Sequence, residues 1–346
     1  MSERILVTGG AGFVGTNLAD RLLEEGHRVT VLDDLSRAGV GQNLRWLQER
    51  HGGAVRTEIA DVADRGALRR VLEGVDRVFH LAAQVAVTTS LGDPEADAHA
   101  NLIGTLALLE ELRRLDAPPR LLFTSTNKVY GGLEDVALVE AGDRYEPADP
   151  DVRARGIGER RPLDFHTPYG CSKGAADQYV LDYARSYGIE SVVFRMSCIY
   201  GPHQFGTEDQ GWVAHFLIRA LEGEPITIYG DGRQVRDVLF VEDLVEAMTQ
   251  VTRDARHAGR AFNVGGGPAN CVSLLELLDL IAELTGEAPA VEFGEWRPGD
   301  QRYYVSDTRS LREAAGWAPR VDPREGVERL HDWLVRDRGR ADRAVV

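Results

Sequence analysis

A tyrosine and a lysine four residues apart, together with a threonine earlier in the chain, are the residues best suited to chemistry. Tyr169 and Lys173 lie in the run Tyr-Gly-Cys-Ser-Lys, and Thr126 ends an apolar run. Residues four apart share a helix face, so the ammonium can stand beside the phenol. A phenol with a pKa of about 10 is a poor base, and a nearby ammonium lowers that pKa. The three residues predict proton transfer at a substrate hydroxyl, which Thr126 would hydrogen-bond.

A glycine-rich turn near the start of the chain predicts a dinucleotide site. The run Thr8–Gly15 follows a strand-like segment and opens a helix-like one. Glycines permit a tight turn and close backbone approach, and a helix N-terminus attracts pyrophosphate. Asp33 ends the next predicted strand, where a carboxylate binds the adenosine ribose and repels a 2′-phosphate. The pattern favours NAD over NADP, although Arg37 nearby would suit a 2′-phosphate.

We expect the cofactor to contact the glycine turn, the loop after the second strand and two short segments that follow later strands. Lys173 can also hold the nicotinamide ribose. The alternative is a plain glycine turn beside a solvated aspartate. The predicted cofactor-binding residues are Gly9, Gly12, Phe13, Val14, Gly15, Asp33, Leu35, Ser36, Arg37, Asp61, Val62, Leu81, Ala82, Ala83, Gln84, Tyr169 and Lys173.

The elements that must position these residues alternate between apolar runs and helix-period segments, which predicts a parallel sheet covered on both faces. Strands are expected over 5–8, 28–32, 77–81, 121–125 and 190–194. Helices are expected over 15–25, 65–72, 96–115, 172–186, 273–284 and 323–336. The predicted fold class is α/β, a Rossmann doubly wound parallel sheet with a smaller C-terminal α/β substrate lobe. We expect an NAD-binding domain over 1–195 and mainly the substrate lobe over 196–346, with the chain able to cross between them.

Composition limits the partners. The 346 residues are 43% hydrophobic and carry a formal net charge of −15, which argues against nucleic acid and anionic membranes as partners. The three cysteines lack metal-ligand spacing and indicate free thiols, no disulfide and no metal site. Neither a leader pattern nor an apolar run of membrane-spanning length is found. We therefore expect a soluble, cytoplasmic protein.

Together the motifs resemble the extended short-chain dehydrogenase/reductase superfamily of NAD-dependent nucleotide-sugar epimerases and dehydratases. The resemblance spans nearly the whole chain and is carried by the glycine turn, Asp33, Asn101–Thr105, Val129–Gly131, the Tyr169/Lys173 pair and Gly316–Pro319. Within the superfamily, the segments over 34–37, 125–131, 164–179, 209–213 and 234–239 look like those of the CDP-tyvelose epimerases, also called CDP-paratose 2-epimerases.

This resemblance implies inversion at C2 of a CDP-linked hexose. Tyr169 as phenolate would take the 2-hydroxyl proton while NAD takes the C2 hydride, and the hydride would return to the other face of the turned 2-keto sugar. The alternatives are 4-epimerisation or 4,6-dehydration of a nucleotide sugar and, more remotely, a non-catalytic NAD-binding scaffold. Dehydratases usually carry Asp-Glu where this chain has Asn127 and Lys128. Relatives pair through helices, so a homodimer or homotetramer is expected.

The resemblance also implies a set of substrate contacts. Arg236 and Arg302 match positions where superfamily members place guanidinium groups on the substrate pyrophosphate, which such groups bind bidentately, and surface salt bridges are the alternative role. Cys171 would line the sugar site, or else pack on a helix face. The predicted substrate-binding residues are Asn127, Cys171, Gln210, Gly211, Arg236 and Arg302. The roles of Lys128 and Cys198 stay open.

Overall fold

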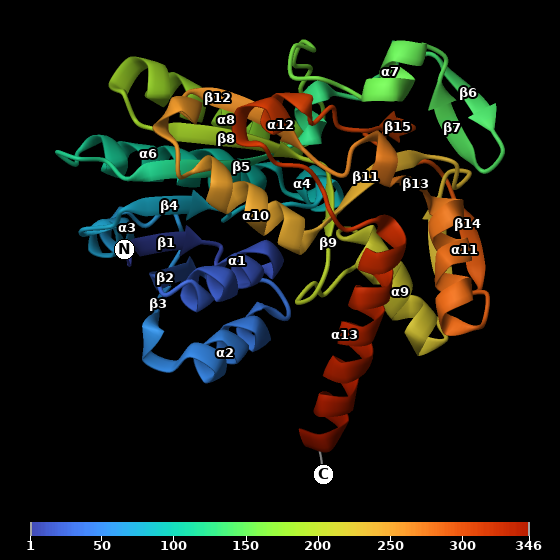
Figure 1. Ribbon diagram of the computed structural model, residues 1–346, viewed down its shortest axis with the longest axis horizontal. Helices are drawn as coiled ribbons and strands as arrows, with labels where there is room; N and C mark the ends of the chain where they lie inside the picture. Colours follow the sequence, from blue (N-terminus) through green and yellow to red (C-terminus); the bar gives the residue numbers. More distant parts are fainter. Residues whose placement is uncertain (1, 345–346) are drawn as a thin grey trace.

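The structure is a computed structural model that describes residues 2–344, with side chains described as far as Asp337. Within that range the largest element is a sheet of seven parallel strands in the order β12-β8-β5-β4-β1-β2-β3 (Figure 1). Its strands are β1 (Arg4–Thr8), β2 (Arg28–Asp33), β3 (Val55–Ile59), β4 (Arg77–His80), β5 (Arg120–Thr126), β8 (Ser191–Met196) and β12 (Arg260–Val264). Parallel strands are buried on both faces, which is why these are short apolar runs.

Helices cover both faces of the sheet, and this confirms the predicted Rossmann fold. One core contains residues of α1 (Phe13–Glu24), α2 (Val40–His51), α10 (Val241–Val251) and α12 (Arg309–Ala315). The other contains residues of α3 (Arg65–Leu72), α6 (Gly104–Arg113) and α8 (Thr167–Tyr187). Ile5 and Val7 of β1 belong to the first core and Leu6 to the second, as the alternation of side chains along a strand requires.

The segment predicted as one helix over 96–115 is divided in the structure. α5 (Pro94–Ala98) leads into a π-helical turn, η2 (His99–Ile103), and then into α6. Such turns are local widenings of a helix that are frequent at functional sites. This one carries Asn101, whose buried amide donates to Asp97 at 3.1 Å and to Ser172 of α8 at 3.0 Å. The turn therefore joins this helical segment to α8.

The second half of the chain builds a smaller α/β lobe with its own core (Figure 1). Its strands pair as β13-β11-β15, with β9 also on β11, and as β10-β14. Its elements are β9 (Cys198–Tyr200), α9 (Trp212–Glu222), β10 (Ile226–Tyr229), β11 (Val235–Phe240), β13 (Cys271–Ser273), α11 (Leu274–Thr285), β14 (Val291–Gly294), β15 (Tyr303–Tyr304) and α13 (Pro323–Ala344). The shorter elements are η1 (Gly52–Ala54), α4 (Val87–Gly92), η3 (Asn127–Tyr130), β6 (Leu138–Ala141), β7 (Arg144–Pro147), α7 (Pro150–Arg155), η4 (Ala255–His257) and η5 (Pro268–Asn270). Among the described helices, none combines the length and apolarity needed to span a membrane.

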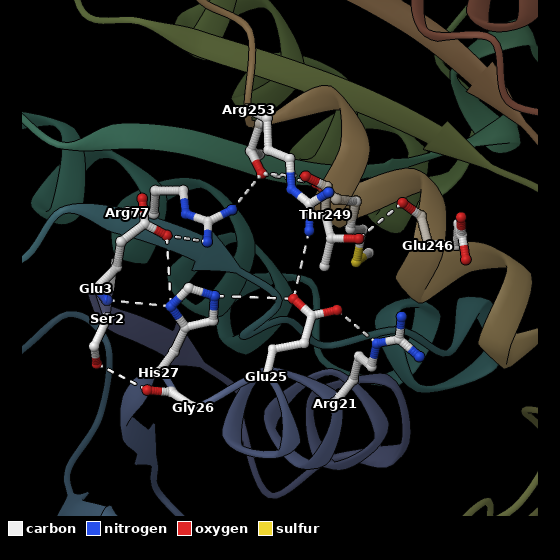
Figure 2. Close-up of polar contacts among 12 residues, drawn as sticks. Ser2, Glu3, Arg21, Glu25, Gly26, His27, Arg77, Glu246, Thr249 and Arg253 are labelled. Carbon is white, nitrogen blue, oxygen red and sulfur yellow. Dashed lines mark hydrogen bonds and ion pairs between the residues drawn. The ribbon is translucent and has the colours of Figure 1, made fainter.

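The chain crosses between the two parts, because β12 and α10 come from the second half and yet pack with the sheet. Figure 2 shows one of the contacts that join the two parts, an ion pair between Arg253, just after α10, and Glu25 at the end of α1. The two charged groups lie 3.5 Å apart, and Glu25 also neighbours His27. Arg77 of β4 donates to Thr252 at 3.1 Å. A division after residue 195 therefore cuts through the sheet. As a boundary between folding units it stays a proposal, and residues 345–346 lie outside the described part.

A buried ion pair attaches α8 to the sheet. Arg195 of β8 donates from Nε and Nη2 to the two carboxylate oxygens of Asp177 on α8, at 2.9 Å each. Its Nη1 donates to the hydroxyl of Tyr130 at 3.2 Å, and that hydroxyl donates to Asn263 of β12 at 2.7 Å. Removing one partner of a buried ion pair strongly destabilises the fold, because the remaining charge is left buried without a counter-charge. This network fixes the helix that carries Tyr169.

We predict that Asp177→Asn lowers the free energy of unfolding by about 3–5 kcal/mol, since it leaves the buried Arg195 guanidinium without its counter-charge. Urea denaturation monitored by circular dichroism measures the change. The matched control is Asp182→Asn on the same helix, where an exposed pair lies 3.8 Å from Arg185 and should contribute less than about 1 kcal/mol. Equal effects of the two substitutions would contradict the structural role of the buried pair.

Candidate active site

A cavity of about 910 Å³ lies where the carboxyl ends of the sheet strands meet the lobe. Ligands of open α/β sheets bind at this edge, because the loops that follow parallel strands converge there. The sheet half contributes the glycine turn, the loop after β2 and the ends of β4 and β5. The lobe contributes the start of α9, residues of β10 and β11, and the loop before β15.

Most of the residues predicted for the site line this one cavity. Those that do are Gly9, Gly12, Phe13, Val14, Gly15, Asp33, Ser36, Arg37, Asp61, Val62, Leu81, Ala82, Ala83, Gln84, Thr126, Asn127, Tyr169, Lys173, Gln210, Gly211 and Arg236. Three predicted residues are not part of its lining: Leu35, Cys171 and Arg302. The structure therefore brings together groups from both halves of the chain.

The glycine turn and the end of β2 form a cradle that fits a dinucleotide. Gly9 has φ +66°, and a Cβ there would lie 2.6 Å from the backbone nitrogen of Ala82, so a side chain would fill the space. Asp33 accepts the backbone N–H groups of Ala11 at 3.0 Å and Leu35 at 2.9 Å, one on each carboxylate oxygen. Each oxygen keeps a lone pair for a ribose hydroxyl. This donor set fits NAD.

The loop after β2 places one predicted residue outside the cavity lining and adds a contact. Leu35 adopts φ 57°, and its side chain packs against the core below α1 and α2 instead of lining the cavity. The reason is the tight turn that its backbone makes around the Asp33 carboxylate. Arg37 does line the cavity, and its guanidinium donates to the side-chain oxygen of Gln210 in the lobe. Arg37 thus connects the predicted cofactor loop to the lobe.

Thr126, Tyr169 and Lys173 meet at the end of β5. The hydroxyl of Thr126 donates to the side-chain oxygen of Asn127 at 3.3 Å and accepts the backbone N–H of Lys128 at 3.2 Å. It also lies beside the phenol of Tyr169, whose pKa it lowers in part. α8 begins at Thr167 with Pro168 in its first turn, a position where the missing N–H of proline costs nothing. That start places Tyr169 in the first turn and Lys173 one turn later, with both side chains buried. The amine of Lys173 lies 4.3 Å from the centroid of the Phe123 ring.

Burial dominates the ionisation of this pair. It raises the pKa of Tyr169 to about 12, against the hydrogen bond with Thr126, and it lowers the pKa of Lys173 to about 7. The predicted lowering of the phenol's pKa by the lysine is therefore wrong for the protein by itself, because desolvation disfavours both charged forms. Asp177 and Asp97 partly restore the charge of Lys173.

Asp97 is held in place by amide and hydroxyl donors. Gln84 donates to it at 2.9 Å and Ser172, the residue before Lys173, at 2.5 Å. Gln84 also donates to the carbonyl of Ala86 at 2.8 Å. The predicted cofactor residue Gln84 thus lines the cavity while its amide serves to orient this carboxylate. Burial raises the pKa of Asp97 although these donors lower it in part.

Cys171 lies on α8 but faces away from the cavity. It is two residues from Tyr169, about 200° around a helix of 3.6 residues per turn, so the two side chains take opposite sides. The structure shows Cys171 exposed, with its thiol 3.8 Å from the carbonyl of Phe165. Cys171 therefore does not line this cavity, and its contact with the sugar stays a prediction.

Arg302 also turns away from the cavity. It is exposed beside the fully buried Gln301, and its guanidinium lies over the rings of Tyr145 and Trp296. Arg302 therefore does not line this cavity, and its contact with the substrate stays a prediction.

Arg297, in the same loop, lines the cavity in its place. Its guanidinium lies 3.6 Å from the centroid of the Tyr229 ring and 2.8 Å from Glu208. Sequence reasoning missed this residue. No local pattern in the sequence marks it, because its contacts are with residues of β10 and of the segment before α9 that lie far away along the chain.

Lys128 and Arg236 add positive charge to the lobe side of the cavity. The chain has two lysines, Lys128 and Lys173, and both line the cavity. Burial and the neighbouring Arg236 lower the pKa of Lys128 to about 8, and its amine donates to the carbonyl of Gly299 at 2.8 Å. Cys198 lies beside these cations, and burial raises the pKa of its thiol. In a chain of net charge −15, this local positive charge suits an anionic ligand.

We predict that Lys173→Met removes a pH-dependent part of the stability. The pKa of Lys173 is about 7 in the folded protein and 10.5 when unperturbed, so between these values the unfolded chain binds a proton that the folded chain does not. The free energy of unfolding of the wild type should therefore rise through this window, by up to about 1.4 kcal/mol per pH unit relative to the variant.

Urea denaturation of both proteins at pH 7.5, 8.5 and 9.5 tests this prediction. Lys128→Met is the matched control, because the pKa of Lys128 is about 8 and its slope should begin about one pH unit higher. If the difference in the free energy of unfolding between the wild type and Lys173→Met stays constant over these pH values, Lys173 is not desolvated.

Comparison with known proteins agrees with the fold. The model of the NAD dependent epimerase/dehydratase family matches residues 5–265. A CDP-paratose 2-epimerase of Salmonella typhi is 42% identical over 338 residues, covering 95% of this chain and 98% of the relative. A UDP-glucose 4-epimerase of Mycolicibacterium smegmatis is 35% identical over 332 residues, covering 96% and 98%. The crystal structure of the UDP-glucose 4-epimerase of Thermus thermophilus in complex with NAD superposes with a TM-score of 0.80 at 33% identity, covering 96% of this chain and 99% of that one. The chain belongs to the NAD dependent epimerase/dehydratase family.

Proposed function

We propose that this protein is an NAD-dependent epimerase that inverts C2 of a CDP-linked hexose, of the CDP-paratose/CDP-tyvelose type, through a 2-keto intermediate. The observation that carries the proposal is the 42% identity to a CDP-paratose 2-epimerase along 95% of the chain. The cavity supports it, because proton-transfer groups and an anion-binding wall face the same space.

Proton transfer is assigned to Tyr169, with Thr126 as its hydrogen-bonding partner. When bound, NAD supplies a reversible acceptor for the hydrogen at C2, so that the cycle consumes no oxidant. As phenolate, the form that the positive charges of Lys173 and of bound NAD would favour, Tyr169 takes the proton of the 2-hydroxyl as the ketone forms and gives it back as the ketone is reduced. Lys173 adjusts this exchange through its charge, which its low pKa allows to change near neutral pH.

Epimerisation requires that the sugar turn while the rest of the ligand stays bound. We assign the diphosphate to Arg236, Arg297 and Lys128, which line the lobe side of the cavity. Guanidinium groups pair with phosphate oxygens bidentately and hold the nucleotide end firmly. The sugar can then present either face of C2 to the nicotinamide, and the surrounding walls keep the ketone from escaping.

The residues after Thr126 argue against dehydration as the main reaction. Asn127 and Lys128 occupy the turn there, whereas removal of a hydroxyl as water calls for a carboxylic acid and a base beside the sugar. Asn127 uses its amide to donate to Gln301 at 3.2 Å. A C4 epimerase remains the second candidate, because a UDP-glucose 4-epimerase is 35% identical to this chain.

We also propose that the protein works as a homodimer, with a homotetramer as the alternative, in the cytoplasm. Exposed apolar side chains are found on the adjoining helical segments α4, η2 and α8, namely Leu91, Ile103, Tyr179 and Tyr187. Apolar groups gathered on helices suit a helical bundle with a second copy of the chain. The free thiols of all three cysteines suit a reducing compartment.

The first test follows the ring protons of nucleotide sugars by proton NMR in deuterated water, with purified enzyme and no added cofactor. CDP-paratose and CDP-, UDP-, dTDP- and GDP-hexoses are supplied in turn. We expect inversion at C2 of the CDP sugar without deuterium at C2, because the same hydrogen leaves and returns. Inversion at C4 would favour the second candidate. Deuterium at C5 with loss of the C6 hydroxyl would mean dehydration, and an unchanged spectrum for every sugar would refute the proposal.

We predict that Tyr169→Phe lowers kcat by about 10²–10⁴-fold, the usual contribution of a general acid–base group. The affinity for CDP, measured by calorimetry, should stay the same because the phenol faces the sugar. Tyr183→Phe is the matched control: it removes a buried tyrosine hydroxyl from the same helix, bonded to Glu110 at 2.8 Å, away from the cavity. If both variants keep their activity, the assignment of Tyr169 fails.

A further inference from the structure

We propose that Gln301 is a positioning residue for the reaction: its buried amide and carbonyl hold the turn after Thr126 and the arginine of β11 in one fixed relation. The kinetic part of this inference rests on the proposed function. The structural part does not, because it concerns how the two halves of the site are joined.

Gln301 bonds to both halves through three different groups. Its side-chain oxygen accepts from the amide of Asn127 at 3.2 Å, and its side-chain nitrogen donates to the carbonyl of Gly131 at 2.6 Å. Its backbone carbonyl accepts from the guanidinium of Arg236 at 2.5 Å. The side chain has no exposed surface, so each of these bonds is protected from water. A buried amide satisfied on both ends fixes the positions of its partners.

The residues on either side of Gln301 strengthen this connection. We call residues 297–301 the strap. Lys128 donates to the carbonyl of Gly299 at 2.8 Å. Gly299 has φ +77°, and a Cβ there would lie 2.8 Å from the side chain of Thr167, the first residue of α8. The strap therefore runs between the turn after β5 and the start of the helix that carries Tyr169.

Gln301 links the turn that follows Thr126 to the arginine assigned to the diphosphate. The ends of η3 are bound to the strap through Asn127 and Gly131, and Thr126 lies immediately before that turn. Arg236 is bound to the same residue of the strap. The turn that follows Thr126, the neighbour of Tyr169, and the diphosphate anchor Arg236 are thus both connected to Gln301. A shift of about 1 Å between groups that must meet around a substrate can cost about 100-fold in rate.

The test uses Gln301→Met, which keeps the length of the side chain, removes both side-chain bonds and leaves the carbonyl that Arg236 uses. Asn270→Leu is the matched control. Asn270 is a buried amide of the same lobe that donates to the carbonyl of Val321 at 3.0 Å and lies outside the cavity lining. Kinetics, CDP affinity and thermal unfolding are measured for both variants and the wild type.

We expect Gln301→Met to lower kcat by about 10- to 100-fold, with the dissociation constant of CDP changed by less than about threefold. The melting temperature should fall by a similar amount in the two variants, while Asn270→Leu keeps its kcat. An unchanged kcat in Gln301→Met, or an equal loss of kcat in Asn270→Leu, would overturn the positioning role.

Hydrogen–deuterium exchange supplies a readout that needs no turnover. In Gln301→Met the backbone amides over 127–131 should exchange at least about tenfold faster than in the wild type, and in Asn270→Leu they should not. Unchanged exchange would refute the inference even if kcat falls. Faster exchange in a protein that inverts no CDP sugar would support the inference while the proposed function fails, so the two failures can be told apart.

Discussion

The pairing of Arg195 with Asp177 is the interaction on which the rest of the site depends. Both side chains are buried, and two hydrogen bonds of 2.9 Å join them. Because a charge in a medium of low polarity is costly without its partner, the pair holds α8 against β8 in one register. Tyr169 and Lys173 lie on the turns of α8 that precede Asp177, so their place at the end of β5 follows from this attachment.

The same burial sets the chemistry. Burial of the two side chains raises the pKa of Tyr169 and lowers that of Lys173. Both residues therefore tend toward their neutral forms, and the carboxylates of Asp97 and Asp177 decide how much charge Lys173 keeps. Because desolvation and a few fixed charges oppose each other, a charged ligand in the cavity would change the pKa values of Tyr169 and Lys173.

The two halves of the cavity are joined by polar contacts as well as by packing. Arg37 reaches Gln210 from the loop after β2, and Gln301 joins the turn after β5 to β11. A reaction in which one end of the ligand turns and the other stays needs such fixed distances between its anchors. The chain also crosses back from the lobe, because β12 joins the sheet and α10 packs in its core, and this connects the lobe to the sheet.

The sequence by itself determined the features that depend on neighbours along the chain. The strand and helix periods predicted the doubly wound sheet, the glycine turn and Asp33 predicted the dinucleotide cradle, and the four-residue spacing predicted that Tyr169 and Lys173 share a helix face. Only the tertiary structure decided which side chains of those segments reach the ligand. Helix phase turns Cys171 outward, contacts with Tyr145 and Trp296 hold Arg302 at the surface, and a tight turn packs Leu35 against the core. Arg297 and Gln301 reach the site through contacts between residues more than 60 apart in sequence, and no local pattern encodes such contacts.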